Sequence, residues 1–216
     1  MPVKNAKPQR RLGRPPRGTE GEVTLRILDA ATQVFLSESF DAVSIDAIAS
    51  AASISKKTFY TRFASKGDLF EAFAVRFIEE RVQPVEQIDL DKMSTAEALH
   101  DIAAGILKTV LCPDVVALQR NVMAEAIRFP ELARSLEDFG QSRVVAIVER
   151  CLEEGVRREE IQVKDIRFTA DYFVTAMVRG PFHRAMIGLE RPEFSHVKHE
   201  NLKRALDLFL NGCLPR

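Results

Sequence analysis

Hydrophobic residues recur with helical spacing along almost the whole chain from Thr19 onward. The first stretch places them at i, i+4, i+7 and i+8, as one face of an amphipathic helix requires: Ile27, Ala31, Val34 and Phe35. No segment shows the apolar–polar alternation of a half-buried strand, and the sequence contains no tandem repeat. The pattern predicts an all-α fold.

Capping residues divide this pattern into about nine helices. Four serines stand where an N-cap is expected, and two prolines suit the first helical position: Ser44, Ser55, Ser65, Ser94, Pro113 and Pro130. The helices are expected at about 20–38, 44–51, 55–62, 65–83, 94–111, 113–129, 130–155, 165–188 and 193–211. The fourth is expected to stop before Pro84, because the residue before a proline disfavours the helical conformation. The seventh is expected to kink near Gly140.

Composition and charge narrow the functional classes. Of the 216 residues, 46% are hydrophobic and 29% charged, which is typical of a folded globular chain, and no apolar run approaches membrane-spanning length. Residues 1–67 hold 11 Lys and Arg against 6 Asp and Glu, whereas residues 68–216 hold 20 against 25. The net charge of zero therefore hides a basic N-terminal end, where a polyanion such as nucleic acid is expected to bind.

The sequence contains few residues that suggest disulfide bonds, a metal site or catalysis. The three cysteines are widely spaced and form no Cys-x-x-Cys, so we expect no disulfide framework, a cytoplasmic location and no membrane partner. His196 and His199, beside Glu200, have metal-ligand spacing but no distant third ligand, so no metal site is expected. No nucleophile elbow, phosphate-binding loop or dinucleotide fingerprint occurs, so we expect no enzyme activity and no cofactor.

The stretch SIDAIASAASISKKTFYTRF, residues 44–63, predicts two short helices joined by a turn of three or four residues. This is the geometry of a helix-turn-helix, whose second helix enters the major groove of DNA. In that second helix the phenylalanines share an apolar face, and another face carries Lys56, Lys57 and Tyr60. The alternative is an ordinary amphipathic surface helix.

The longer run IASAASISKKTFYTRFASKGDL, residues 48–69, closely resembles the DNA-binding signature of TetR-family transcriptional regulators, roughly A-x-x-A-G-V-S-x-G-T-L-Y-x-H-F-x-S-K-E-x-L. Nine positions match it: Ala49, Ala52, Ser55, Thr58, Tyr60, Phe63, Ser65, Lys66 and Leu69. The resemblance covers about residues 22–73. This chain departs from the signature at the turn glycine, which is Ser53, and has Lys57 and Arg62 where glycine and histidine are common. If Ser53 requires a left-handed backbone, the serine costs about 1 kcal/mol.

The resemblance implies that eight residues of this region bind DNA: Ser44, Ser55, Lys56, Lys57, Thr58, Tyr60, Arg62 and Lys66. The residues at the start of the second helix would reach base edges, where a lysine can donate to guanine O6 and N7. Ser44, Tyr60 and Lys66 would each bind a phosphate. The alternatives are that Ser55 serves as an N-cap and that Lys66 is simply solvated.

The first 18 residues are expected to form a flexible basic arm. They carry six Lys and Arg and no acid, and they lack hydrophobic periodicity. Gly13-Arg14-Pro15 resembles the core of an AT-hook, although Leu12 stands where a full hook has arginine. Arg14 is expected to enter a minor groove, with nonspecific phosphate contact as the alternative.

The resemblance also implies a domain order: a helix-turn-helix domain at 19–66, a connecting helix at 67–86, and an effector-binding and dimerisation domain at 87–216. A homodimer independently suits the reading of DNA, because two heads about 34 Å apart reach successive major grooves. We expect the last two helices to form the dimer interface, through Phe168, Tyr172, Thr175, Gly180, Leu202, Leu206 and Phe209. Filling of the monomer core by these residues is the alternative.

An effector pocket is expected where methionine and other apolar residues gather in the C-terminal domain: Met123, Ile127, Phe139, Phe173 and Met177. Such stripes are also typical of an ordinary core. The sequence therefore favours a homodimeric, sequence-specific DNA-binding regulator, a repressor released from a palindromic operator by a small-molecule effector. A ligand-independent DNA-binding architectural protein is the nearest alternative. A small-molecule-binding protein or an enzyme with a non-functional head is the distant one.

Overall fold

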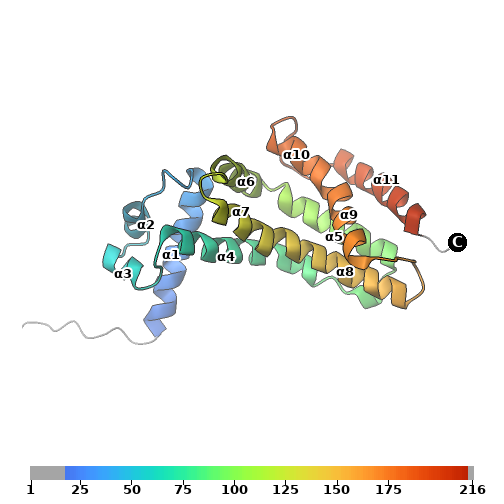
Figure 1. Cartoon of the computed structure of the whole chain (residues 1–216), viewed down its shortest axis with the longest axis horizontal. Coiled ribbons are helices and arrows are strands. Elements are labelled where there is room, and N and C mark those ends of the chain that lie inside the picture. Colours follow the sequence, from blue (N-terminus) through green and yellow to red (C-terminus); the bar gives the residue numbers. More distant parts are fainter. Residues whose placement is uncertain (1–17, 214–216) are drawn as a thin grey trace, which may run out of the picture.

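Residues 18–213, which the computed structural model describes, contain helices and no strand, as predicted. The N-terminal helices are α1 (Gly18–Ser37), α2 (Ile45–Ala51), α3 (Lys56–Tyr60) and α4 (Lys66–Glu86). The C-terminal helices are α5 (Thr95–Val110), α6 (Pro113–Glu125), α7 (Pro130–Leu136), α8 (Ser142–Arg157), α9 (Ile166–Val174), α10 (Gly180–Met186) and α11 (His196–Cys213), with a short 3-10 turn, η1 (Leu90–Lys92). The molecule is elongated, with α2 and α3 at one end and α11 towards the other (Figure 1).

Two of the longer helices contain a π-helical turn. The turn η2 (Glu137–Gln141) joins α7 to α8, and η3 (Thr175–Arg179) joins α9 to α10, so each pair forms one continuous helix. Counted in this way, the described residues form nine α-helices, in agreement with the sequence pattern. Gly140 lies inside η2, so the predicted irregularity at this residue takes the form of a π turn, a feature that is frequent at functional sites.

The predicted serine N-caps are confirmed. The hydroxyl oxygens of Ser44, Ser55 and Ser65 each accept the backbone N–H three residues later, at 3.0 Å. Ser94 forms a complete capping box with Glu97, whose carboxylate accepts the Ser94 N–H at 2.9 Å. These bonds satisfy N–H groups that the first helical turn leaves without a partner, and they fix where α2 to α5 begin.

The predicted end of the fourth helix at Pro84 is wrong. Helix α4 continues to Glu86, and beyond it the N–H of Gln87 still donates to the Gln83 carbonyl at 3.1 Å. Pro84 lies in the last turn, where its missing N–H removes a single backbone bond. Val85 is buried among residues of α5 and α8, and this packing holds the last turn in place.

Aromatic rings form the centre of the N-terminal core. We call α1 to α3 and the N-terminal half of α4 the head. Neighbouring rings in and around its core lie 4.9–5.9 Å apart between centroids, and the six rings are Phe35, Phe40, Phe70, Phe73, Phe77 and Phe129. Phe129 belongs to the turn between α6 and α7, and Leu118, Val122 and Leu132 of the same region are buried in this core. The head is therefore packed directly against α6 and α7.

A second core fills the C-terminal part. Its buried residues come from the end of α4 and from α5, α6, α8, α9, η3, α10 and α11. The central side chains are fully buried, including Leu99, Ile102, Leu107, Val148 and Phe173. Because α4 and α6 contribute to both cores, they connect the head to the C-terminal helices.

Candidate DNA-binding surface and effector cavity

The turn between α2 and α3 is tight and includes one left-handed residue. Ser53 has a φ of +53°, and the N–H of Ile54 donates to the Ala49 carbonyl at 2.9 Å. The serine thus stands in the conformation for which the sequence analysis predicted a cost. Behind the turn, Ile48 and Phe59 are fully buried and anchor both helices in the head.

We expect Ser53→Gly to raise the free energy of unfolding by about 1 kcal/mol, because glycine adopts positive φ without the Cβ clash. Ser50→Gly is the matched control, since Ser50 is exposed and helical in α2. That variant is expected to lose about 0.5 kcal/mol, the difference in helix propensity between serine and glycine. Urea unfolding followed by circular dichroism measures both changes. Shifts of the same sign in the two variants would contradict this explanation.

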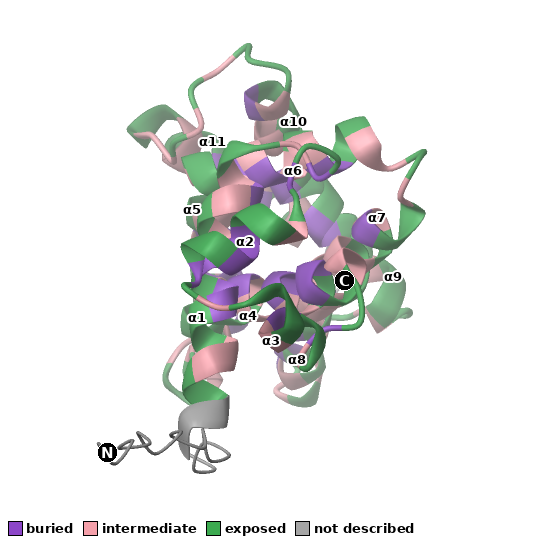
Figure 2. Ribbon diagram, turned by 90° about the vertical axis from the view of Figure 1, so that its left-hand side faces the viewer, coloured by how far each residue is buried: buried purple, intermediate pink, exposed green. Residues whose placement is uncertain are grey.

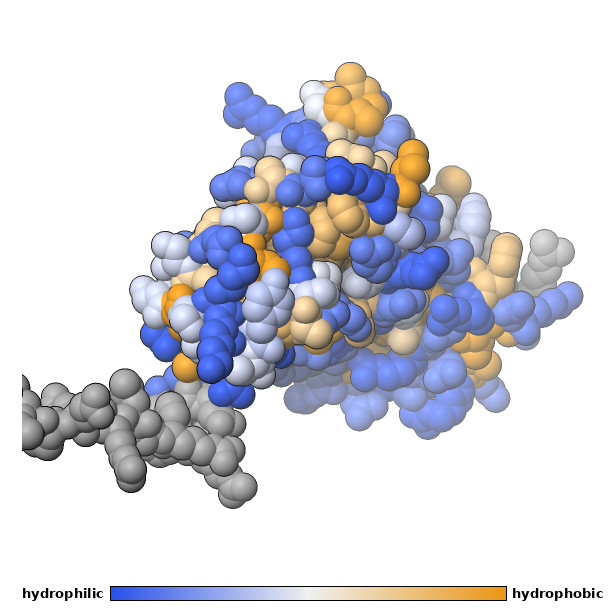
Figure 3. Space-filling view, turned by 60° about the vertical axis from the view of Figure 1, so that its left-hand side comes forward, coloured by the Kyte–Doolittle hydropathy of each residue, from blue (hydrophilic) through white to orange (hydrophobic). Residues whose placement is uncertain are grey.

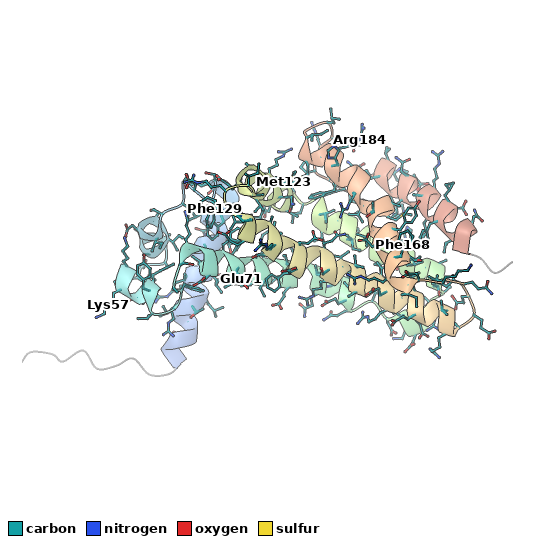
Figure 4. The ribbon with its side chains drawn as sticks, viewed as in Figure 1. Lys57, Glu71, Met123, Phe129, Phe168 and Arg184 are labelled. Atoms are coloured by element: carbon teal, nitrogen blue, oxygen red, sulfur yellow. The ribbon has the colours of Figure 1, made fainter. Side chains whose placement is uncertain are left out.

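The helix-turn-helix presents polar residues to solvent. Figure 2 looks onto this end of the molecule and shows largely exposed residues of α2 and α3 facing the viewer. In Figure 3 the same end is mostly hydrophilic. Lys57 projects from α3 away from the rest of the molecule (Figure 4). Of the residues predicted to bind DNA, five are exposed and three are half-buried; the exposed ones are Ser44, Ser55, Lys56, Lys57 and Tyr60, and the half-buried ones Thr58, Arg62 and Lys66.

Two hydroxyls at the start of α3 form a pair. The Ser55 and Thr58 oxygens lie 2.8 Å apart, and Ser55 also caps the helix. The capping role of Ser55 is confirmed, and its contact with a base stays a prediction. Because both side chains are already positioned, they offer a fixed polar surface at the N-terminal end of α3.

Lys56 is paired within the helix-turn-helix. Its Nζ lies 2.9 Å from Oδ2 of Asp46, in the first turn of α2, and hydrogen bonding to this carboxylate raises the pKa of Lys56. Lys57, one residue later, forms no ion pair with any described side chain. The two lysines of α3 therefore differ: one is held by an acid, and the other extends into solvent. The sequence analysis did not identify Asp46 as part of this surface, because Lys56, with which it pairs, is ten residues away along the chain.

Lys66 faces the loop between α1 and α2. Its ammonium donates to the carbonyls of Phe40 at 2.6 Å and Val43 at 2.8 Å, and it lies 4.4 Å from the Phe40 ring centroid. Burial of this group lowers the pKa of Lys66. The lysine thus ties the loop to the start of α4. This arrangement differs from both interpretations of Lys66 in the sequence analysis, and a phosphate contact stays a prediction. Arg14 lies outside the described residues.

An apolar cavity of about 310 Å³ lies where α4, α5, α6, the α7–α8 helix and the α9–α10 helix meet. This volume is at the lower end of the range for small-molecule sites. Its walls are mainly aliphatic and aromatic, with five polar side chains among them: Arg81, Thr109, Gln119, Glu137 and Gln141. The π turn η2 contributes three wall residues, and Val174 and Val178 come from the region of η3. Both π turns therefore border the cavity.

Two of the polar wall residues, Arg81 and Gln141, differ in whether their polar groups have hydrogen-bond partners. The Arg81 guanidinium lies 3.5 Å from the Phe77 ring centroid and donates to the Phe77 carbonyl at 3.1 Å. The amide nitrogen of Gln141 is buried and has no hydrogen-bond partner among the described residues. A buried amide group without a partner is costly, so Gln141 is a candidate for a polar contact with a ligand.

Only one of the predicted pocket residues borders this cavity. Met123 lies in its wall and is also largely exposed, at the outer side of α6 (Figure 4). Ile127 is fully exposed, Phe173 and Met177 are buried in the C-terminal core, and Phe139 is half-buried. The actual wall residues form apolar stripes that resemble ordinary core in the sequence, so the pattern could not separate them from it.

Helix α6 lies between the cavity and the head. Leu118 and Val122 line the cavity and are buried in the core of the head. The Asn121 amide donates to the Glu38 carbonyl at 3.2 Å, and the guanidinium of Arg128 pairs with the Asp41 carboxylate at 2.7 Å. A change in the position of α6 would therefore reach the loop between α1 and α2 directly.

The residues predicted to form the dimer interface fall into an exposed group and a buried group. Phe168, Tyr172, Thr175 and Gly180 are exposed, and the first two rings are stacked 6.4 Å apart between centroids. Leu202 and Leu206 are buried within the chain, and Phe209 is half-buried against Phe173. These α11 residues follow the core alternative, because the exposed face of α11 carries Val197 and Leu208 instead.

Other candidate chemistry is not assembled in the described part of the chain. Between residues 18 and 213 no three His, Cys, Asp or Glu side chains are grouped closely enough to hold a metal ion. Cys151 is buried, and burial raises the pKa of its thiol to about 12, so it is not a reactive thiolate. None of the described helices is long and apolar enough to cross a membrane.

Comparison with family models covers both parts of the chain. Residues 27–73 match the model described as bacterial regulatory proteins of the tetR family. Residues 97–212, more than half of the chain, match the C-terminal domain of AefR-like transcriptional repressors. This chain belongs to the TetR family of transcriptional regulators. The helix-turn-helix of this TetR-family regulator is the DNA-binding element of the family.

Individual relatives agree with this assignment. The DNA-binding transcriptional repressor TetR of Mycobacteroides abscessus is 28% identical over 170 residues, which cover 75% of this chain and 86% of the relative. The solved structure of the flavonoid-responsive regulator FrrA is 30% identical, with a TM-score of 0.78, and covers 91% of this chain and 99% of its own. A TetR-family regulator from Mesorhizobium loti, 22% identical with a TM-score of 0.80, covers 91% of this chain and 98% of its own and shares the fold.

Proposed function

We propose that this TetR-family regulator is a homodimeric repressor that binds a palindromic operator and leaves it when a small, largely apolar molecule fills the cavity. The observation that carries the proposal is the double position of α6. Leu118 and Val122 form part of the cavity wall and part of the core of the head. A ligand that displaces α6 must therefore shift the packing of the head, and with it the recognition helix.

The cavity favours a neutral effector with few polar groups. Aliphatic and aromatic side chains dominate its walls, and the two charged wall residues, Arg81 and Glu137, carry opposite signs. Gln141 offers a buried amide to an oxygen of the ligand. The relative FrrA is flavonoid-responsive at 30% identity. We infer that the effector is an aromatic ketone or phenol of flavonoid size.

Dimerisation is proposed through the exposed face of α9 and α11. Phe168, Tyr172, Val197 and Leu208 are all more than half exposed. The Phe168 and Tyr172 rings are stacked, and a contiguous exposed apolar patch is typical of an interface that is covered in the assembly. Two copies joined at this end would carry two heads, as the reading of a palindrome requires.

The test is ligand-induced release. An operator is first selected from fragmented genomic DNA with the purified protein. Its dissociation constant is then measured by fluorescence anisotropy with and without flavone and a panel of other neutral aromatic ketones. We expect a ligand to weaken operator binding by about tenfold or more, within the usual range of allosteric coupling. If the compounds bind the protein and leave operator affinity unchanged, the release mechanism is wrong.

The ion pair between Arg128 and Asp41 is expected to transmit this response. Arg128→Gln removes the charge that holds the turn after α6 against the loop of the head. We expect ligand affinity to stay within about twofold while the ligand-induced change in operator affinity falls several-fold, because coupling is a free energy shared by both sites. Arg134→Gln, on the exposed face of α7, is the control. Equal coupling in wild type and Arg128→Gln would show that the contact plays no part.

A further inference from the structure

Two oppositely charged side chains lie together on the surface of the helix-turn-helix. Lys56 is the first residue of the recognition helix α3, and Asp46 belongs to the first turn of α2. Their Nζ and Oδ2 atoms are 2.9 Å apart, and the side chains are 53% and 70% exposed. An ion pair so exposed contributes little to folding. The pair lies beside Ser55, on the surface that meets DNA in this family, where both side chains are accessible to a ligand.

The pair has a hydrogen-bonding pattern that complements the major-groove edge of a base pair, and it makes the most contacts with G·C. It presents a donor, the Lys56 ammonium, next to an acceptor, the Asp46 carboxylate. In the major groove, a G·C pair presents the acceptors N7 and O6 on guanine beside the N4–H donor on cytosine. Guanine O6 and cytosine N4 are joined by a base-pair hydrogen bond, so they are about 2.9 Å apart. The spacing of the protein groups equals the spacing of the base edges.

An A·T pair fits less well. Adenine carries a donor at N6 where guanine carries the acceptor O6, so an ammonium facing the purine loses one of its two acceptors. A phosphate fits only half of the pair, because it attracts Lys56 and repels Asp46. The carboxylate accepts from adenine N6 as well as from cytosine N4, so it discriminates against the DNA backbone and against the reversed C·G pair, whose guanine O6 it would face. The lysine, with two acceptors on guanine and one on adenine, discriminates against A·T.

We infer that Asp46 and Lys56 together read one G·C base pair in each half-site, with Lys56 donating to guanine O6 and N7 and Asp46 accepting from cytosine N4. The inference rests on the DNA-binding function. In the free protein each side chain satisfies the other. On the operator each of the two side chains exchanges this contact for a hydrogen bond to a base. The other side chain stays close enough to hold it in position.

The first experiment selects binding sites from a random-sequence DNA library with the full chain and its variants. Asp46→Ala and Lys56→Met are compared singly and together. The matched control is Asp68→Ala, which also removes an acid from a first helical turn. Lys57→Met is compared as well, and it is expected to weaken operator binding without changing the base preference at the position read by Lys56. The wild type is expected to select a G·C pair at one position of each half-site. Lys56→Met is expected to lose about tenfold of this preference, the size of one good bidentate contact. Asp46→Ala is expected to lose several-fold, because it removes one hydrogen bond, and the double variant is expected to lose no more than Lys56→Met.

The second measurement needs only the wild-type protein. At the selected position, G·C is replaced by inosine·cytosine, which keeps the same major-groove edge, and by A·T. Operator affinity is expected to stay within about twofold for the first and to fall about tenfold for the second.

Three results would overturn the inference. One is an unchanged base preference in Asp46→Ala together with stronger binding to every sequence, since Asp46 then only repels DNA. Another is equal loss of the G·C preference in Lys57→Met. The third is weaker binding to the inosine operator. Each leaves the DNA-binding function intact, whereas failure of the wild type to select any motif would contradict the function itself.

Discussion

Replacing Phe73 by alanine is expected to lower the free energy of unfolding by about 4 kcal/mol. The Phe73 ring is buried and lies 5.4 Å from Phe35, 5.7 Å from Phe70 and 5.3 Å from Phe77 between centroids. Its removal opens a void between α1 and α4 that the surrounding rings cannot fill. Because native stability is commonly about 5–15 kcal/mol, the head of this variant is expected to bind DNA poorly near 37 °C.

Urea unfolding at a fixed protein concentration measures this loss, since assembly makes apparent stability depend on concentration. Leu25→Ala is the control, because Leu25 lies on the same helix as Phe35 but is half exposed. The control is expected to lose less than about 1 kcal/mol. A loss of similar size in the two variants would show that the aromatic cluster does not stabilise the head.

Gly140→Leu is expected to abolish the ligand response while DNA binding persists. Gly140 lies in the cavity wall, and a Cβ at this residue would meet only the Ile78 side chain, at 3.7 Å. A leucine therefore fits the backbone without a clash and places its isobutyl group in the space that a ligand would use. Leucine also has higher helix propensity than glycine, by about 0.8 kcal/mol, so the fold is expected to be kept or strengthened.

The same anisotropy titration with flavone and neutral aromatic ketones measures the effect. Operator affinity without ligand is expected to stay within about threefold of the wild type, and the ligand-induced weakening of about tenfold is expected to disappear. Gly21→Leu is the control, because a Cβ at Gly21 on α1 meets nothing within 4 Å. A ligand response that persists in Gly140→Leu would place the effector outside this cavity.

The sequence predicted those features that depend on neighbouring residues. The serine caps, the helical starts at Pro113 and Pro130, and the turn at Ser53 are set by contacts over a few residues. The helix-turn-helix was recognisable for the same reason, because its signature combines local caps with two apolar positions, which are the buried Phe59 and Phe63 in this chain.

Features that depend on distant residues were not predictable. Lys66 binds carbonyls 23 and 26 residues earlier, and nothing in its own segment indicates them. The apolar stripe containing Leu202 and Leu206 could pack either against a second copy of the chain or against the rest of its own chain. The structure distinguishes these two possibilities, because α11 packs against α5 and η3. The cavity depends on gaps between five packed helical segments, whereas the sequence records only that their residues are apolar.

The most direct test of the central claim compares two DNA duplexes. The operator selected from genomic fragments and a scrambled duplex of the same composition are titrated at one salt concentration, and the operator titration is repeated over a salt series. We expect the palindromic operator to bind at least about 10³-fold more tightly than the scrambled duplex. The logarithm of its binding constant is expected to fall linearly with the logarithm of salt concentration. Equal affinity for the two duplexes would contradict the conclusion that this chain recognises a DNA sequence.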